Sequence, residues 1–542
     1  MTTQEHNLVD YDSAVREFRL DVPERFNFGR DVVDRWAADP AKLAMLWLGS
    51  DGSERRLTFR HFAERSDRFA SLLRRLGVRP GDRVMVQLPR VPQWWEVLLG
   101  CFKAGAVAVP GTVLLTPKDI QYRTGLAEGV AYVTDADGAQ KVDQVRGECP
   151  SLRHLIQAGE EPLSADWLAY GAELDDAAGS PVPVDTASSD PALIYFTSGT
   201  VGNPKMVLHT HAYPIGHQIT GRLWLDLRPD DLHLNLSDTG WAKAAWSSFL
   251  GPWNAGAALF VQDARGRFNA SETLDLLESY PITTFCAPPT AYRMLVLEDL
   301  SRRRLRALRW CVGAGEPLNP EVIETWERGT GHVIRDGYGQ TETVLLCGNF
   351  PSLSVKPGSM GKPSPGMTVA VIDDEGSALP PDSEGDIAVR MRPERPVGLF
   401  KEYWRNPEAT AASQRGDWYI TGDRAYVDGD GYFWFVGRSD DVIISAGYRI
   451  GPFEVESALI EHPAVAEAAV VGKGDPMRGT IVKAYVILVP GRSESEELTR
   501  ELQEHVKGVT AAYKYPREIE YVGELPKTIS GKIRRVELRA KS

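Results

Sequence analysis

The sequence is poor in cysteine and has no long apolar run. Its 542 residues include five cysteines, which are widely spread and never form a C-x-x-C pair: Cys101, Cys149, Cys286, Cys311 and Cys347. This pattern argues against a disulfide framework and against a zinc site, and it favours a reducing compartment, which we expect to be the cytoplasm. The N-terminal residues are polar, and no apolar run is long enough to span a bilayer, so we expect neither a signal peptide nor membrane insertion.

An excess of positive charge is also absent. Lys and Arg number 61 against 74 Asp and Glu, so the formal net charge is -13. Such a protein is poorly suited to nucleic acid or an anionic membrane as its main partner, because both are negatively charged. With 25% charged and 43% hydrophobic residues the composition is that of a globular protein. The length suggests about two to four domains or subdomains.

The chain alternates strand and helix patterns. From Thr58 onward, strands alternate with helical patterns of about ten residues, which is typical of mostly parallel sheets covered by helices on both faces. A stretch rich in Pro, Ser and Ala at 177–190 separates two such lobes. After about Met360, glycines and prolines interrupt the pattern, and short β-like runs predict a small β-barrel or sheet appended to the second lobe. The C-terminal segment mixes strands and helices, which indicates an α+β module.

We therefore predict an α/β fold with two domains. A large N-terminal domain of doubly wound sheets plus a small β-barrel is expected at 1–437, and a small mobile α+β C-terminal domain at 441–542. The segment that joins them, 437–441, is polar and lacks an apolar anchor. This composition indicates a hinge at 438–440, with Asp440 as its pivot.

A candidate phosphate-binding loop follows the apolar run at 192–196, which predicts a short buried strand. Glycine lets the backbone turn its N–H groups inward, while hydroxyl groups and a lysine add donors and charge, so the loop suits a polyanion. It is not a Walker A loop, because Pro204 precedes Lys205. An ordinary surface turn is the alternative. The loop consists of Thr197, Ser198, Gly199, Thr200, Val201, Gly202, Asn203, Pro204 and Lys205.

Five further segments combine glycine with acidic, aromatic or basic residues, and most of them follow predicted strands, where open α/β sheets bind ligands. They are 237–241, 313–317, 336–343, 419–423 and 525–532. Taken singly, each of these segments can also be interpreted as having only a structural role. Trp241 is then a core residue, Asp423 a turn former and Lys532 a solvated charge.

Together and in this order, the six motifs resemble those of the adenylate-forming superfamily, which contains acyl-CoA synthetases, luciferases and adenylation domains. The resemblance covers about 57–535, and residues 423–456 and 513–517 are most similar to medium-chain acyl-CoA synthetases. It implies an ATP-dependent carboxylic acid:CoA ligase that forms an acyl-adenylate and then gives acyl-CoA, AMP and pyrophosphate. The implied cofactors are ATP, Mg²⁺ and coenzyme A.

The resemblance also assigns roles to residues of this chain. Lys532 would join the carboxylate to the α-phosphate, and Asp423 would hold the ribose hydroxyls. Glu342 and the Thr200 hydroxyl would hold Mg²⁺. The implied catalytic set is Lys532, Glu342, Asp423 and Arg438. Beyond the phosphate loop and these residues, the nucleotide would be framed by Gly315, Glu316, Pro317, Asp336, Gly337, Tyr338, Gly339, Gln340, Thr341 and Arg449.

By the same resemblance, the C-terminal domain would rotate about Asp440 between two half-reactions. Lys532 would close the site for adenylation and then withdraw. The opposite face of the domain would then bind CoA. The residues implied there are Ala446, Gly447, Tyr448, Arg478, Lys507, Tyr515, Pro516 and Arg517.

One position bears on the size of the acid that is activated. Synthetases for acetate are similar to this chain around Gln340 but carry tryptophan where this chain has Gly339. Glycine is expected to leave the acyl pocket open there, with Trp241 as an apolar wall. We therefore expect a medium-chain, branched or small aromatic acid rather than acetate.

Two other functions stay open at this point. The enzyme could load an acyl carrier protein instead of CoA, although the basic residues of the C-terminal domain count against this. It could also be a non-catalytic nucleotide-binding module, but that would predict a damaged motif, and Lys205, Glu342, Asp423, Arg438 and Lys532 are all present. Lys532 is also a candidate for a lysine acetyltransferase and deacetylase, because acetylation would remove its charge. The oligomeric state is left open.

Overall fold

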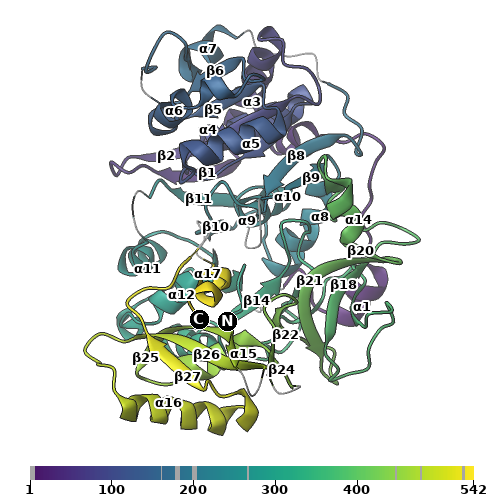
Figure 1. The fold of residues 1–542 in the computed structure, drawn as a ribbon. Coiled ribbons are helices and arrows are strands. Elements are labelled where there is room, and N and C mark those ends of the chain that lie inside the picture. The colour runs from purple at the N-terminus through teal and green to yellow at the C-terminus, as the bar shows by residue number, and fades with distance from the viewer. Residues whose placement is uncertain are drawn as a thin grey trace.

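The computed structural model describes residues 6–159, 161–177, 184–197, 204–264, 266, 268–445, 448–475, 479–527 and 532–542. Figure 1 shows a large body that runs from purple to green and a smaller yellow-green part packed against its lower end. Large sheets with helices beside them form the body, and a three-stranded sheet forms the smaller part. The predicted α/β fold class, with a large N-terminal and a small C-terminal part, is confirmed.

An eight-stranded sheet forms the first lobe. Its strands β3 to β8 pair in parallel, and β9 pairs antiparallel with β8. The order is β19 (Glu402–Tyr403), β9 (Met206–Thr210), β8 (Pro191–Phe196), β4 (Val107–Pro110), β3 (Arg83–Gln87), β5 (Ala131–Thr134), β6 (His154–Gln157) and β7 (Leu168–Ala169). The crossovers between β3 and β6 are α4 (Gln93–Ala104), α5 (Pro117–Ala127) and α6 (Ala136–Asp143). The buried strand β8 leads directly into the candidate phosphate loop.

A nine-stranded sheet forms the second lobe, and its strands from β14 to β1 pair in parallel. The order is β16 (Lys362–Pro363), β15 (Cys347–Gly348), β14 (Ile334–Tyr338), β13 (Trp310–Ala314), β12 (Thr284–Ala287), β10 (Leu232–Asn235), β11 (Ala258–Gln262), β1 (Leu43–Leu48) and β2 (Glu54–Thr58). Its connecting helices include α9 (Ala242–Ser247), α10 (Leu250–Asn254), α11 (Ala270–Ser279), α12 (Pro289–Leu295) and α13 (Pro320–Thr330). Because the strands are parallel, the loops that follow them meet at one edge of the sheet.

The region predicted as a small β-barrel is a five-stranded antiparallel sheet. It contains β17 (Val369–Ile372), β18 (Gly385–Arg390), β21 (Trp418–Val427), β20 (Gln414–Arg415) and β22 (Phe433–Arg438), and α14 (Pro407–Ala412) precedes β20. The pairing of β21 with β22 puts Asp423 opposite Arg438. Two of the predicted catalytic residues therefore become neighbours through backbone register alone.

The C-terminal part has a sheet and a core of its own. Its elements are β23 (Ile443–Ser445), β24 (Tyr448–Ile450), α15 (Pro452–Ile460), β25 (Val465–Asp475), β26 (Gly479–Leu488), α16 (Glu496–Val509), β27 (Glu518–Tyr521) and α17 (Arg535–Lys541). Helices α15 and α16 bury Val455, Leu459 and Leu502 against Val470 and Val482 of the sheet. The predicted domain boundaries and the hinge at 438–440 stay predictions.

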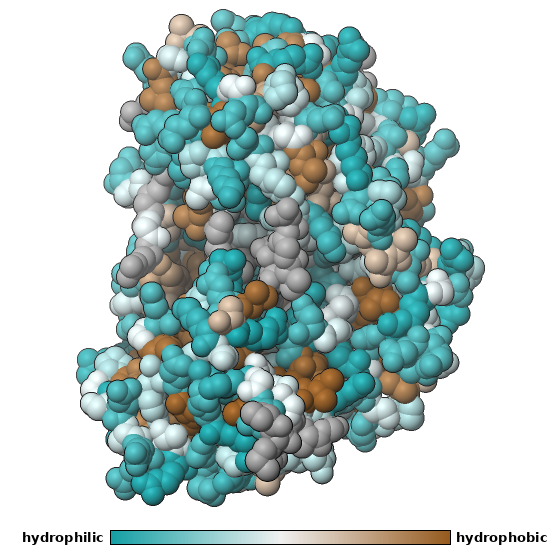
Figure 2. Space-filling model, in the orientation of Figure 1, coloured by the Kyte–Doolittle hydropathy of each residue, from teal (hydrophilic) through white to brown (hydrophobic). Residues whose placement is uncertain are grey.

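Further helical elements complete the described chain. They are α1 (Tyr11–Glu17), η1 (Gly29–Val33), α2 (Asp34–Trp36), α3 (Phe59–Arg75), η2 (Arg146–Glu148), α7 (Tyr170–Asp176), α8 (Tyr213–Gln218), η3 (Ile219–Trp224), η4 (Leu300–Arg302) and η5 (Ala512–Lys514). Among them, α3, α8 and η3 contribute to the main hydrophobic core. Within the described ranges, no helix is both long enough and apolar enough to cross a bilayer. The five cysteines are buried free thiols. The face in Figure 2 is mostly hydrophilic, with apolar side chains in small separate patches.

Candidate active site

A cavity of about 490 Å³ lies between the large body and the C-terminal part. From the body it is lined by residues of the loops after β8, β13 and β14 and of strands β21 and β22. From the C-terminal part it is lined by Lys532, by α15 and by α17. Most of the residues predicted to bind nucleotide line it: Thr197, Lys205, Gly315, Glu316, Pro317, Asp336, Gly337, Tyr338, Gly339, Gln340, Thr341, Glu342, Asp423, Arg438 and Lys532.

The phosphate loop is described only at its two ends. Thr197 N donates to Lys205 O at 2.9 Å, and Lys205 N donates to the Thr197 hydroxyl at 3.0 Å, so the loop closes on itself. The Lys205 ammonium lies over the Tyr403 ring, 4.8 Å from its centroid. Residues 198–203, including the predicted Mg²⁺ ligand Thr200, lie outside the described residues.

Asp423 is held in a buried network on the cavity wall. Its Oδ2 accepts hydrogen bonds from Tyr338 OH and from Gln340 Nε2, both at 2.6 Å. Its Oδ1 lies 3.4 Å from NH1 of Arg438. Burial raises the pKa of Asp423, while Arg438 and the Tyr338 hydroxyl act in the opposite direction. The Oδ1 side of the carboxylate is thus left for hydroxyl donors of a ligand.

Glu342 is a second buried carboxylate of the same cavity. Its Oε1 accepts a hydrogen bond from Tyr403 OH at 2.7 Å, and burial raises its pKa. No group of three or more metal-ligating side chains occurs in the part of the chain that the structure describes. One carboxylate nevertheless suits Mg²⁺ bound to a nucleotide, because that ion takes most of its ligands from phosphate oxygens and water.

The Asp336 and Glu316 side chains organise the loops rather than offering free charge. The carboxyl of Asp336 is buried and accepts from Gly337 N at 2.9 Å, and burial raises its pKa well above the usual range. Glu316 accepts from Arg293 at 2.9 Å and from the Thr290 hydroxyl at 2.8 Å. These bonds hold the loops after β13 and β14, which are the segments predicted to frame the nucleotide.

Contacts of α15 and α17 position Lys532. Arg535 NH2 donates to both carboxylate oxygens of Glu456 at 2.7 Å, and Arg539 donates to Asp441 at 2.7 Å. Burial raises the pKa of Asp423, and the positive charge of Lys532 is close enough to oppose that rise. The lysine therefore faces the predicted ribose site from the opposite wall of the cavity.

The residues predicted to bind CoA that the structure describes do not line this cavity. Lys507 and Arg517 both lie over the Tyr515 ring, at 4.2 and 4.8 Å from its centroid. Pro516 follows Tyr515 and accepts a hydrogen bond from Gln503. These residues form one patch on the C-terminal part, which we call the Tyr515 patch. Ala446, Gly447 and Arg478 lie outside the described residues.

Two further predicted residues lie on the exposed strand β24. Tyr448 stacks on Tyr513 with ring centroids 4.3 Å apart. Arg449, predicted to lie near nucleotide oxygens, is exposed and does not line the cavity. The structure therefore does not bring Arg449 to the nucleotide residues.

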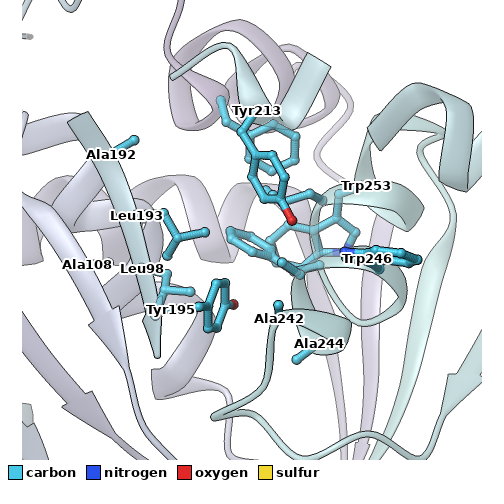
Figure 3. Packing of buried hydrophobic residues seen from close by; sticks show 14 of the residues in the cluster. Leu98, Ala108, Ala192, Leu193, Tyr195, Tyr213, Ala242, Ala244, Trp246 and Trp253 are labelled. Carbon is cyan, nitrogen blue, oxygen red and sulfur yellow. The ribbon is translucent and has the colours of Figure 1, made fainter. Parts of the chain in front are cut away.

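The predicted acyl pocket differs from expectation. Gly339 lines the cavity, but a Cβ built there would lie 2.2 Å from Cη2 of Trp246 and 2.7 Å from Val344 O. The indole of Trp246 therefore occupies the space beside Gly339 that was expected to be open. Trp246 is 4% exposed and packs in the aromatic cluster of Figure 3 with Tyr213 and Trp253. Trp241, the other predicted wall residue, is partly buried and precedes α9.

Three residues around the site lie outside the motifs that are visible in the sequence. Tyr403 links Glu342 to Lys205, Trp246 fills the space before Gly339, and Lys243 of α9 donates to Ala314 O. None lies in a glycine-rich motif. The signal that was available for Lys243 is a lysine within an otherwise apolar stretch, 241–246.

Comparison with known proteins places this geometry in a family. Residues 33–404 match the family described as AMP-binding enzyme, and residues 454–532 match the AMP-binding enzyme C-terminal domain. The chain is 48% identical to acyl-coenzyme A synthetase ACSM3, mitochondrial, of Mus musculus, with 100% of this chain and 94% of that protein covered.

Two solved structures are also similar. One is the anthranilate CoA ligase AuaEII in complex with anthranoyl-AMP, with 33% identity, a TM-score of 0.88 and coverage of 96% of this chain and 98% of that one. The other is the Brucella canis acyl-CoA synthetase, with 36% identity, a TM-score of 0.77 and coverage of 98% and 99%.

The expected cytoplasmic location is wrong on this evidence, because curated relatives from mouse and human are mitochondrial proteins by name. Buried free thiols indicate a reducing environment, and that property alone does not identify the compartment. The sequence matches, the solved structures and the cavity agree on the class of enzyme. The chain belongs to the AMP-binding enzyme family and, within it, to the acyl-coenzyme A synthetases, which use ATP, coenzyme A and Mg²⁺.

Proposed function

We propose that the protein activates a medium-chain, branched or small aromatic carboxylic acid with ATP and transfers the acyl group to CoA. One observation carries this proposal. Lys532 of the C-terminal part lines the same cavity as Asp423, Glu342 and Arg438 of the large body. This arrangement supports acyl-adenylate formation, because the groups needed for it converge on one space.

Positive charge is the main requirement of the first step. The acid is a carboxylate and ATP is a polyanion, so their approach is repelled unless cations lie where negative charge develops. Lys205 and Arg438 reach the cavity from the body, and Lys532 reaches it from the C-terminal part. In the proposal Lys532 lies between the carboxylate and the α-phosphate, and it stabilises the transition state as pyrophosphate leaves.

Asp423 binds the ribose in this proposal. Two donors already occupy its Oδ2, so the ribose hydroxyls donate to Oδ1, beside Arg438. Tyr338 and Gln340 hold the carboxylate in one orientation, which removes the need to reorganise it on binding.

Glu342 holds the magnesium ion in this proposal. Its Oε1 accepts a hydrogen bond from Tyr403 OH, so Oε2 would be the oxygen available to hold the ion. The bound ion supplies charge neutralisation at the phosphate oxygens. Tyr403 fixes the Glu342 carboxylate and also lies beneath the Lys205 ammonium, so it couples the two phosphate-directed groups.

The Tyr515 patch binds the CoA nucleotide in the second step. It combines two basic side chains with an aromatic ring and lies outside the adenylation cavity. Rotation of the C-terminal domain about Asp440 would withdraw Lys532 and present another face of the domain to the acyl-adenylate. The contacts that such a rotation must break include Asn319 Nδ2 to the Ser457 hydroxyl at 3.0 Å.

The test of the proposed function is pyrophosphate release with ATP and Mg²⁺. Acids from acetate to decanoate, together with benzoate, are assayed with and without CoA. Continuous release with one of these acids only when CoA is present supports the ligase. A single burst that CoA does not turn over would indicate a carrier-protein acceptor, and no release with any acid would contradict the proposed function.

Acetylation of Lys532 is a further part of the proposal. The side chain is exposed in the structure, and acetylation would remove the charge that the first step needs. Mass spectrometry of protein from its own cells is expected to find an acetylated fraction with lower adenylation activity. Finding Lys532 always unmodified in cells would contradict the proposed acetylation.

A further inference from the structure

Lys243 is a charged side chain that the proposed mechanism does not use. It lies on α9, and its ammonium donates to Ala314 O at the end of β13. A Cβ built on Gly315 would lie 4.0 Å from Nζ of Lys243. Because Gly315 lines the cavity, the ammonium lies at the edge of the space where the reaction is proposed to occur.

The charge of Lys243 is poorly compensated. Among the described residues no carboxylate forms an ion pair with it, and Ala314 O is the acceptor of its hydrogen bond. The nearest acidic groups are engaged elsewhere: Glu316 is paired with Arg293, and Asp336 is buried with a raised pKa. An ammonium has three N–H donors, so two are left for a ligand. A partly buried charge with so few partners is costly unless a ligand supplies an acceptor.

The neighbours of Lys243 on α9 locate that ligand. Trp246 is three residues further along, so the two side chains lie on the same side of the helix. The Trp246 indole lies against Gly339. Lys243 therefore lies close to the loop after β13 and on the same side of α9 as the indole that contacts Gly339 of the predicted acyl pocket.

We propose that Lys243 donates a hydrogen bond to an oxygen on the acyl chain of the acid. The preferred substrate is then a carboxylic acid with a second acceptor group, such as a carbonyl, a hydroxyl or a second carboxylate. This inference rests on the proposed function and names a substrate class for it. A plain alkanoic acid would leave the two remaining N–H donors of Lys243 without a partner, and such an unmade bond is expensive in a buried site.

The experiment compares four acids of equal chain length: pentanoate, 3-hydroxypentanoate, 4-oxopentanoate and glutarate. Values of kcat/KM come from pyrophosphate release with CoA present. Binding of each acid in the presence of a non-hydrolysable ATP analogue is measured by calorimetry. The variants are Lys243→Met, which keeps an unbranched side chain one atom shorter and removes the charge, and Lys42→Met as a matched control. Lys42 also donates to a backbone carbonyl, that of Pro229, and does not line the cavity.

In the wild type, at least one acceptor-bearing acid is expected to exceed pentanoate by about 10-fold to 100-fold, the usual effect of a hydrogen bond to a charged group. Lys243→Met should abolish that preference in both kcat/KM and Kd, and leave the KM for ATP unchanged. Lys42→Met should keep it.

Three results would overturn this inference: a wild-type preference for pentanoate over all three others, an equal loss for all four acids in Lys243→Met, or a raised KM for ATP with the acid preference intact. Each of these leaves the ligase function standing. Failure of every acid from acetate to decanoate, of benzoate and of the three acceptor-bearing acids would instead contradict the proposed function itself.

Discussion

Replacement of Trp246 by alanine is the sharpest test of where the acyl chain lies. The indole fills the space in front of Gly339, with Cη2 at 2.2 Å from a Cβ built there. It is 4% exposed and packs beside Tyr213 and His217. Trp246→Ala removes the indole without changing any residue proposed to bind ATP. The variant should therefore accept longer acids.

The size of the effect follows from burial. Each methylene that moves from water into the vacated space gains about 0.8 kcal/mol, or roughly fourfold in kcat/KM. Three additional methylenes correspond to about 2.4 kcal/mol, so octanoate should gain on the order of 60-fold relative to pentanoate. The replacement also destabilises the folded protein, because a buried Trp→Ala change lowers the free energy of unfolding by about 3–5 kcal/mol.

The assay is kcat/KM for straight-chain acids from butyrate to decanoate. Trp253→Ala is the matched control, because Trp253 lies in the same aromatic cluster but packs on Phe59, Phe62 and Phe249 rather than on Gly339. It should lose stability without a shift in chain length. If Trp246→Ala does not fold, Trp246→Leu gives a smaller version of the same shift. An unchanged chain-length profile in a folded Trp246 variant would refute the reasoning.

Three further predictions concern other parts of the account. Asp423→Asn should raise the KM for ATP by about 10-fold to 100-fold, because the ribose hydroxyls lose a hydrogen bond to a charged acceptor. An unchanged KM for ATP in steady-state kinetics would contradict the ribose assignment. Glu456→Gln removes the negative charge and one of the two oxygens that accept from Arg535 at 2.7 Å, so the buried guanidinium loses its ion pair. Urea unfolding should report a loss of about 3–5 kcal/mol, and a wild-type midpoint would show that α17 is held by other contacts. Burial lowers the pKa of His233 to about 4 in the folded protein. As the pH falls, this imidazole is therefore protonated in the unfolded chain before it is protonated in the folded protein. Stability that is present above about pH 6.5 is then lost between about pH 6.5 and 4, at about 1.4 kcal/mol per pH unit for this one group. His233→Gln should show a shallower pH dependence of the urea midpoint, and an unchanged slope would argue against the buried neutral imidazole.

Much of the fold and of the nucleotide site is local in origin, and that part could be predicted. A buried strand that runs into a glycine-rich loop is visible in the sequence at 192–205, as are the loops after β13 and β14. Parallel pairing of β13 with β14 then brings the loops that follow these two strands to one edge of their sheet. The pairing of Asp423 with Arg438 also follows from one hairpin register.

The residues that shape the acyl site depend on contacts between distant segments. Gly339 alone suggested an open pocket, but the side chain that fills the space comes from Trp246 on another helix. A tryptophan in an apolar stretch is typical of a core residue, so its contact with Gly339 is not visible in the sequence. The surroundings of Lys243 are also not visible in the sequence, because its separation from carboxylates arises only when α9 packs on β13. Arg449 shows the opposite error, since a motif residue lies outside the cavity in this conformation.

The central claim is that Lys532, brought into the cavity by the C-terminal part, serves acyl-adenylate formation. The most direct measurement separates the two half-reactions in Lys532→Ala. We expect acyl-AMP formation to fall by about 100-fold, while thioester formation from supplied acyl-AMP and CoA stays close to wild type. Lys527→Ala is the matched control, because Lys527 lies on the same segment and is paired with Glu467 at 2.9 Å. Equal loss of both half-reactions in Lys532→Ala, or an equal effect of Lys527→Ala on acyl-AMP formation, would contradict the account.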